Sequence, residues 1–160
     1  MNTQRGFTLI EVLMAVIIIG LAIAGLVGAN RAYTMANGTG WDLTRSEFLI
    51  EQIRELTMTL PVADPQSGQI TFGPESGETL ASYDDLDDLD GCLFDPPIDA
   101  RRNRLTYMAG LGQMITVCNV DPKDLDKIVA DHGSDFVRIT VQIIKAGKVI
   151  DSCTWLRTRY

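Results

Sequence analysis

The feature that most constrains this chain is an uncharged apolar run near its N-terminus. From Val12 to Ala29, eighteen consecutive residues carry no charge. As a helix this run is about 27 Å long at ~1.5 Å per residue. The hydrocarbon core of a bilayer is ~30 Å thick, and residues 7–10 lengthen the run enough to cross it. Arg5 precedes the run and fits the cytoplasmic side. The sequence therefore predicts a membrane anchor over residues 7–29.

One carboxylate, Glu11, stands at the start of this run. A charged side chain costs roughly 2.5–3.5 kcal/mol at the bilayer centre and less near the interface. A plain anchor does not need it, and neither does a secretory signal peptide, for which Ala22-Ile23-Ala24 offers a small-x-small cleavage pattern. A cut between Gly6 and Phe7 would create an amine four residues from Glu11, on the same helix face. That amine could neutralise Glu11 of its own chain or of a neighbouring subunit.

The segment Gly6 to Val12 reads Gly-Phe-Thr-Leu-Ile-Glu-Val. It resembles the type III signal of type IV prepilins and type II secretion pseudopilins, and the close similarity covers residues 1–35. The resemblance implies a leader peptide over residues 1–6, cleavage after Gly6 by a membrane aspartic peptidase, N-methylation of Phe7, and Glu11 paired with the N-terminus of a neighbour in a filament. It further implies an inner-membrane protein whose C-terminal domain lies in the periplasm until assembly. The implied partners are other pilin or pseudopilin subunits, the prepilin peptidase/N-methyltransferase and an inner-membrane assembly platform.

Small residues recur every four positions along the anchor and line one side of a helix. In lipid, helices associate by close approach along such residues. The stripe is therefore a candidate seam between packed subunit helices, although small residues are also frequent in membrane helices in general. Its members are Gly20, Ala24, Gly28, Ala32 and Ala36.

Beyond the anchor the sequence predicts an α+β fold. The breaker cluster Asn37–Gly40 is expected to bend or interrupt the helix. Residues 41–60 then form an amphipathic helix that Pro61 ends. Its apolar positions, at i, i+4, i+7 and i+11, are Leu49, Ile53, Leu56 and Leu60. A long helix over residues 7–60 would thus pack its outer half on a small antiparallel sheet.

Residues 61–103 are rich in Pro, Gly, Asp and Ser and predict a variable loop region, with a short strand at Gln69–Phe72. Residues 104–160 are expected to form the sheet. The predicted elements are a strand at Gln113–Val120, a turn and short helix at Asp121–Ala130, a strand whose apolar residues alternate from Val137 to Ile143, a turn at Lys145–Lys148 and a return strand at Val149–Thr158. The register of the return strand stays open. A three-residue loop with a bulge would set Val149, Cys153 and Trp155 opposite Val137–Ile143, and a two-residue turn would not.

An acidic cluster lies within the loop region. Five carboxylates in seven residues can ligate a hard cation such as Ca²⁺. With Gly91 as the sixth-position glycine of an EF-hand, Leu86 and Pro97 would fall at ligand positions, so the segment is not an EF-hand. A solvated loop, or one whose aspartates meet Arg101, Arg102 and Arg104, is the alternative. Leu86 and Leu89 predict a single helical turn tucked onto the body. The candidate ligands are Asp84, Asp85, Asp87, Asp88 and Asp90.

The three cysteines, Cys92, Cys118 and Cys153, allow at most one internal disulfide. If the strands pair in the order expected, Cys118 and Cys153 lie two strands apart, too far for a Cα separation of ~5.5–6 Å. Cys92 with Cys118 is then the better pair. Three buried, reduced thiols are the alternative.

The sequence predicts a structural protein and not an enzyme. The formal net charge of −7 argues against nucleic acid as a partner. His132 is the only histidine, and it is expected in a solvated polar turn. The favoured function is a minor pilin of a type IV pilus, because a similar Asp-rich segment ending in glycine occurs in minor pilins of the mannose-sensitive haemagglutinin kind. A type II secretion pseudopilin and a membrane-tethered periplasmic binding module that does not polymerise are the alternatives. No cofactor is expected other than Ca²⁺.

Overall fold

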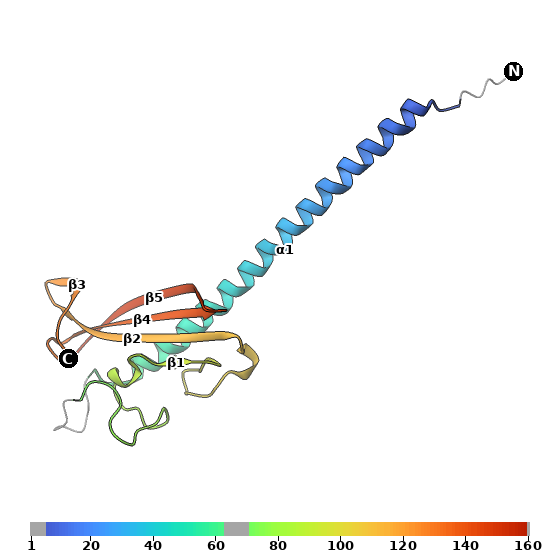
Figure 1. Cartoon of the computed structure of the whole chain (residues 1–160). Helices are drawn as coiled ribbons and strands as arrows, with labels where there is room; N and C mark the ends of the chain where they lie inside the picture. Colours follow the sequence, from blue (N-terminus) through green and yellow to red (C-terminus); the bar gives the residue numbers. More distant parts are fainter. Residues whose placement is uncertain (1–5, 63–70, 160) are drawn as a thin grey trace. The chain divides into compact units, whose positions relative to one another are not determined.

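The computed structural model describes residues 6–62 and 71–159. Residues 1–5 of the predicted leader, with Arg5, and the first half of the predicted strand Gln69–Phe72 lie outside the described residues. The chain divides into two units, Met1–Trp41 and Asp42–Tyr160. One helix, α1 (Leu9–Thr59), contributes to both (Figure 1).

The first unit is the N-terminal part of α1. The helix continues without a break through residues 37–40, so the predicted interruption is wrong. Glycine in a helix costs only about 1 kcal/mol relative to alanine, and the segment holds no proline that would remove a hydrogen bond. The Thr39 hydroxyl also turns back onto the helix and donates to the Met35 carbonyl at 3.0 Å. The i→i−4 ladder therefore persists.

Every described residue from 6 to 41 is exposed in the isolated chain. Within the described residues, α1 is the helix that is long and apolar enough to cross a membrane, and none of its most apolar window is buried. A core helix of a soluble protein would be mostly buried. An uncovered apolar surface of this length needs lipid or other helices against it.

The second unit begins with residues 42–59 of α1, whose apolar stripe faces the sheet. Leu49, Ile53, Leu56 and Leu60 are all buried, as the periodicity predicts. The helix ends two residues before Pro61. The Arg157 guanidinium on β5 donates to the Thr57 and Leu60 carbonyls and so satisfies acceptors at the helix end.

The described part of the chain forms one antiparallel sheet of five strands, which confirms the α+β class. Its path is β1-β2-β4-β5, and β3 pairs with the far end of β2. The buried residues of β4 alternate from Val137 to Ile143, as predicted. The strands are β1 (Leu93–Phe94), β2 (Leu111–Asp121), β3 (Asp124–Ile128), β4 (Phe136–Lys145) and β5 (Lys148–Thr158).

Two predicted loop or helix segments form strands instead. Leu93–Phe94, inside the expected loop region, pairs with Met114 and Gln113 as β1. The short helix expected within Asp121–Ala130 is wrong, because β2 turns back into β3 through a two-residue connection between Asp121 and Asp124. Pro122 there occupies a turn position, for which its fixed φ is equally suited.

The β4–β5 register combines features of both alternatives. Lys145 pairs with Lys148 across a two-residue turn. Both turn residues, Ala146 (φ 49°) and Gly147 (φ 74°), have positive φ, as type I′ hairpin turns require. A shift between Ile143 and Ile144 leaves Ile150 as an extra residue, which is a β-bulge. Trp155 and Cys153 therefore lie opposite Ile139 and Val141, as the alternative with a bulge predicts. Val149 pairs with Ile144 and lies on the other face.

Candidate functional site

The N-terminus of α1 is built as a capping box. The Glu11 Oε2 atom accepts hydrogen bonds from the Thr8 backbone N–H and hydroxyl, both at 2.8 Å. The Glu11 N–H donates in return to Thr8 Oγ1 at 3.4 Å. This reciprocal Thr-x-x-Glu pattern satisfies donors that a helix start leaves open. The sequence analysis identified Glu11 but not Thr8. The Thr-x-x-Glu spacing alone would have predicted Thr8 as the capping residue.

The predicted cleavage point lies just outside this helix. Gly6 and Phe7 are non-helical, and α1 begins at Leu9. Phe7 is 89% exposed. The Gly6–Phe7 peptide bond is thus accessible and free of the helical ladder, as an attacking peptidase requires, and the capped helix begins immediately after it.

The predicted small-residue stripe is uncovered along α1. Gly20, Ala24 and Gly28 are exposed. A Cβ atom added to Gly20 or Gly28 would meet no heavy atom within 4 Å. Both glycines therefore leave room for a second backbone to approach closely, which is the geometry that small residues provide between membrane helices.

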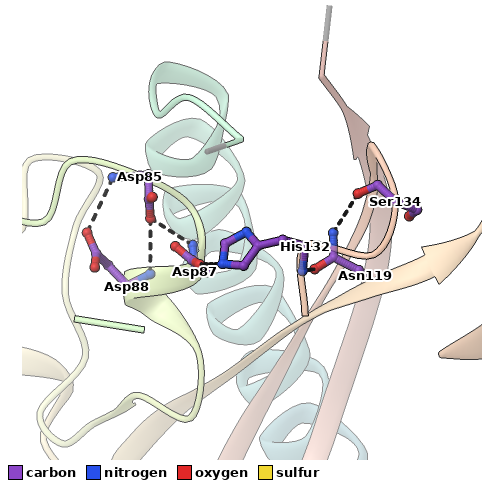
Figure 2. A network of polar contacts seen from close by, with 6 residues as sticks. All are labelled: Asp85, Asp87, Asp88, Asn119, His132 and Ser134. Carbon is purple, nitrogen blue, oxygen red and sulfur yellow. Dashed lines mark hydrogen bonds and ion pairs between the residues drawn. The ribbon is translucent and has the colours of Figure 1, made fainter. Parts of the chain in front are cut away.

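A second reciprocal arrangement organises the acidic cluster (Figure 2). Asp85 Oδ1 accepts from the backbone N–H groups of Asp87 (3.1 Å) and Asp88 (3.3 Å). Asp88 Oδ2 accepts from those of Asp84 (2.9 Å) and Asp85 (3.3 Å). The bonds close a 3₁₀ turn at Asp87–Leu89. Leu86 and Leu89 are fully buried there, so the predicted single turn tucked onto the body is confirmed.

The structure sorts the five candidate aspartates into two groups. Asp85, Asp87 and Asp88 are buried, and one carboxylate oxygen from each lies within 4.8 Å of the others. Asp90 instead fixes the turn to β2, because its Oδ1 accepts from the Val117 N–H at 2.8 Å. Asp84 supplies its backbone N–H to Asp88. Among the five candidates, the carboxylates that lie close enough to share one ligand are therefore those of Asp85, Asp87 and Asp88.

Burial governs the protonation of this set. Desolvation raises the pKa of Asp85 to about 7, and the neighbouring Asp87 carboxyl adds to the effect. Desolvation also raises the pKa of Asp88 to about 6, opposed by the backbone N–H groups it accepts. The pKa of Asp87 is raised as well, again chiefly by burial. Three carboxyls this close disfavour full ionisation.

His132 joins the cluster from the turn between β3 and β4. Its Nε2 lies 3.5 Å from Asp87 Oδ2, and its ring meets the Phe72 ring edge-on with centroids 5.6 Å apart. The Asn119 side chain holds this turn, accepting from the His132 N–H and donating to the Ser134 carbonyl (Figure 2). The predicted turn histidine is confirmed, since His132 lies in an exposed turn. Its approach to Asp87 was not predicted, because tertiary folding brings the two residues together.

The arginines near the cluster have another role. Arg102 donates from its guanidinium to the Leu80, Ala81 and Tyr83 carbonyls, at 2.6–3.1 Å. Arg104 donates to the Asp95 carbonyl at 3.4 Å. The expected ion pairing of the arginines with the acidic cluster is therefore wrong for these two side chains. Arg102 instead holds the segment that leads into the cluster.

The predicted Cys92–Cys118 disulfide is absent, since all three cysteines are free. The Cys92 carbonyl accepts from the Ile115 N–H at 2.9 Å, which places Cys118 three residues, or about 10 Å, further along β2. Cys118 also alternates with buried Val117, so it lies on the outward face of β2. The Cys92 thiol packs against the core on the opposite face.

These features define a class: an α+β protein whose long N-terminal helix carries an uncovered apolar surface, a capping carboxylate at its start and an accessible bond just before it. Residues 1–27 match the family of the prokaryotic N-terminal methylation motif. This motif is the hallmark of type IV pilins and pseudopilins, which confirms the predicted resemblance. No curated protein and no solved structure matches the chain.

The motif supports a type IV pilin-like or pseudopilin subunit. It implies assembly with other pilin subunits and processing by the prepilin peptidase. It marks a structural pilin-family protein, and the apolar helix is consistent with membrane anchoring.

Proposed function

We propose that this chain is a minor pilin of a type IV pilus, cleaved after Gly6, N-methylated on Phe7 and assembled through α1. The observation that carries the proposal is the combination of the methylation motif with an anchor in which residues 6–41 are all exposed. A simple tether would bury the same surface in lipid alone, so the methylation motif is what favours a filament subunit. A filament core covers it with the same helices of neighbouring subunits.

The capping box suggests how Glu11 serves both states. Before assembly, the two Thr8 donors share the Glu11 charge within one chain. Cleavage adds an amine at Phe7, and in a filament the amine of one subunit pairs with Glu11 of the next. An unpaired carboxylate in the membrane costs roughly 2.5–3.5 kcal/mol at the bilayer centre. Subunits in the wrong axial register would leave that cost unrelieved, so Glu11 selects the register.

The processing step is tested by mass spectrometry of protein purified from the native membrane. The expected mature N-terminus is N-methyl-Phe7. A chain that begins at Met1 or at Gly25 contradicts the proposal, because the first excludes prepilin processing and the second indicates a signal peptidase.

The assembly step is tested with Glu11→Leu. We expect normal membrane insertion and at least a tenfold loss of subunit from sheared filaments, measured by immunoblot of the membrane and filament fractions. Glu55→Leu is the matched control, since Glu55 is an exposed glutamate of the same helix beyond the anchor. A tethered binding module that never polymerises predicts that Glu11→Leu leaves function intact.

The system that the subunit serves is tested by deleting the gene. Loss or shortening of surface pili with normal protein secretion supports the minor pilin. Loss of secretion with normal pili identifies a type II secretion pseudopilin instead.

A further inference from the structure

The buried acidic cluster has more acceptor oxygens than its hydrogen bonds use. The backbone N–H groups of residues 84, 85, 87 and 88 satisfy one oxygen each of Asp85 and Asp88. Asp88 is 0% exposed, yet its Oδ1 forms no hydrogen bond within the described residues. Asp87 Oδ2 is also buried and forms no hydrogen bond among the described residues, and it lies 3.5 Å from His132 Nε2. A buried charged oxygen without a partner is costly unless another positive group meets it.

The spacing of these oxygens suits a single ion. One ligand oxygen from each of Asp85, Asp87 and Asp88 lies within 4.8 Å of the other two. Calcium–oxygen bonds are about 2.3–2.6 Å long, so ligands on opposite sides of one ion are up to about 5 Å apart. Asp88 also belongs to a second such group with Glu75 and Glu78, whose carboxylates can complete a larger oxygen shell.

From this geometry we propose that Asp85, Asp87 and Asp88 bind a hard divalent cation, Ca²⁺. The ligands are all oxygens, which excludes a preference for soft metals. The loop geometry is irregular, which Ca²⁺ tolerates and Mg²⁺, with its demand for an octahedron, does not. The proposal is independent of whether the chain polymerises.

The surrounding structure preorganises this site. Backbone N–H groups orient the Asp85 and Asp88 carboxylates, and Leu86 and Leu89 fix the turn in the core. The Arg102 guanidinium binds the carbonyls of the preceding segment. Binding would thus need little ordering of the backbone. If Glu75 and Glu78 complete the shell, the ion would also join residues 75–78 to the turn at residues 85–88.

The test is calorimetric titration of Ca²⁺ into the full chain in detergent micelles, with Mg²⁺ in parallel, and thermal unfolding in EDTA and in 10 mM Ca²⁺. We expect saturable Ca²⁺ binding with Kd in the range of about 10⁻⁵–10⁻³ M. The Tm should rise by at least about 5 °C in Ca²⁺. Asp88→Asn should weaken binding at least tenfold, and Asp126→Asn, an exposed aspartate on β3, should bind as the wild type does.

Asp87→Asn is the second variant if Asp88→Asn does not fold, because it leaves the bonds accepted by Asp85 and Asp88 in place; it too should lose affinity at least tenfold. Wild-type protein that shows no heat and an unchanged Tm at 10 mM Ca²⁺ overturns the proposal. So does Ca²⁺ affinity equal to that of the wild type in both the Asp87→Asn and the Asp88→Asn variant. Stabilisation by acid alone, without a response to Ca²⁺, would show that protons neutralise the cluster.

Discussion

Gln113 offers the sharpest test of how the second unit is held together. Its side chain is fully buried at the start of β2. The Nε2 group donates to the Leu49 carbonyl on α1 at 3.0 Å and to the Ile98 carbonyl at 3.2 Å. Its Oε1 accepts from the Ile98 N–H at 2.7 Å. One side chain therefore joins the helix, the sheet and the segment before Asp99.

We expect Gln113→Leu to destabilise the second unit by about 2 kcal/mol. An orphaned Ile98 N–H costs about 1–3 kcal/mol, and each of the two lost bonds to carbonyls costs about 0.5–1.5 kcal/mol. Leucine has a similar size and regains about 1.5–3 kcal/mol through apolar burial. The loss of hydrogen bonds still outweighs this gain, because Ile98 is fully buried and its N–H cannot reach solvent.

Urea unfolding followed by tryptophan fluorescence measures this change. Trp41 is 66% exposed in the folded chain, so the signal comes chiefly from half-buried Trp155. With an m-value of about 1–3 kcal/mol/M, the midpoint should fall by about 1 M. Gln142→Leu, on the outward face of β4, is the matched control and should shift it little. A Gln113→Leu protein as stable as the wild type would refute the reasoning.

Three further outcomes are expected. Ile139→Ala, at a fully buried position of β4, should cost about 2–5 kcal/mol in the same urea assay; a loss below 1 kcal/mol would contradict the packing described. Thr8→Val removes the hydroxyl donor to Glu11 and should lower filament incorporation several-fold in sheared fractions without changing membrane insertion; wild-type incorporation would show that the capping box is dispensable. In EDTA, the Tm should be higher at pH 5 than at pH 8, because the folded pKa values of Asp85 (about 7) and Asp88 (about 6) lie above the ordinary value of 3.8. Their stabilising contribution is complete below pH 4 and is lost as the pH rises through 6 to 7, so a flat or rising Tm over this range would contradict the burial of the cluster.

Local periodicity predicts two parts of the core, one on α1 and one on β4, but not its residues from the loop region, such as Phe94 and Ile98. The buried stripe of α1 from Leu49 to Leu60 and the alternating face of β4 follow from spacings of about 3.6 and 2 residues. The β4–β5 register was not predictable in this way. It depends on a type I′ turn and on a bulge at Ile150, and one residue of slip reverses every side chain that follows.

The long-range parts of the site were equally hidden from the sequence. Asp87 and His132 are 45 residues apart in the sequence. The pairing of β2 with β4 brings the turn that holds His132 next to the 3₁₀ turn that holds Asp87. The Asp-rich segment looked like a solvated loop or an arginine partner. In the structure its leucines are buried and its aspartates accept hydrogen bonds from its own backbone. No local sequence pattern determines which of the five aspartates are buried.

The two reciprocal caps show why similar local chemistry can serve different ends. In both, an acidic side chain accepts backbone N–H groups three residues back, which is a local and self-sufficient arrangement. Around Glu11 the flanking residues are exposed, so a partner's amine can reach the carboxylate and exchange with the Thr8 donors at little cost. Around Asp88 the surroundings are buried, so the second oxygen cannot exchange with water and must be met by a proton or a cation. Exposure of the cap, more than its hydrogen-bond pattern, therefore decides whether a group from outside the chain can reach the carboxylate.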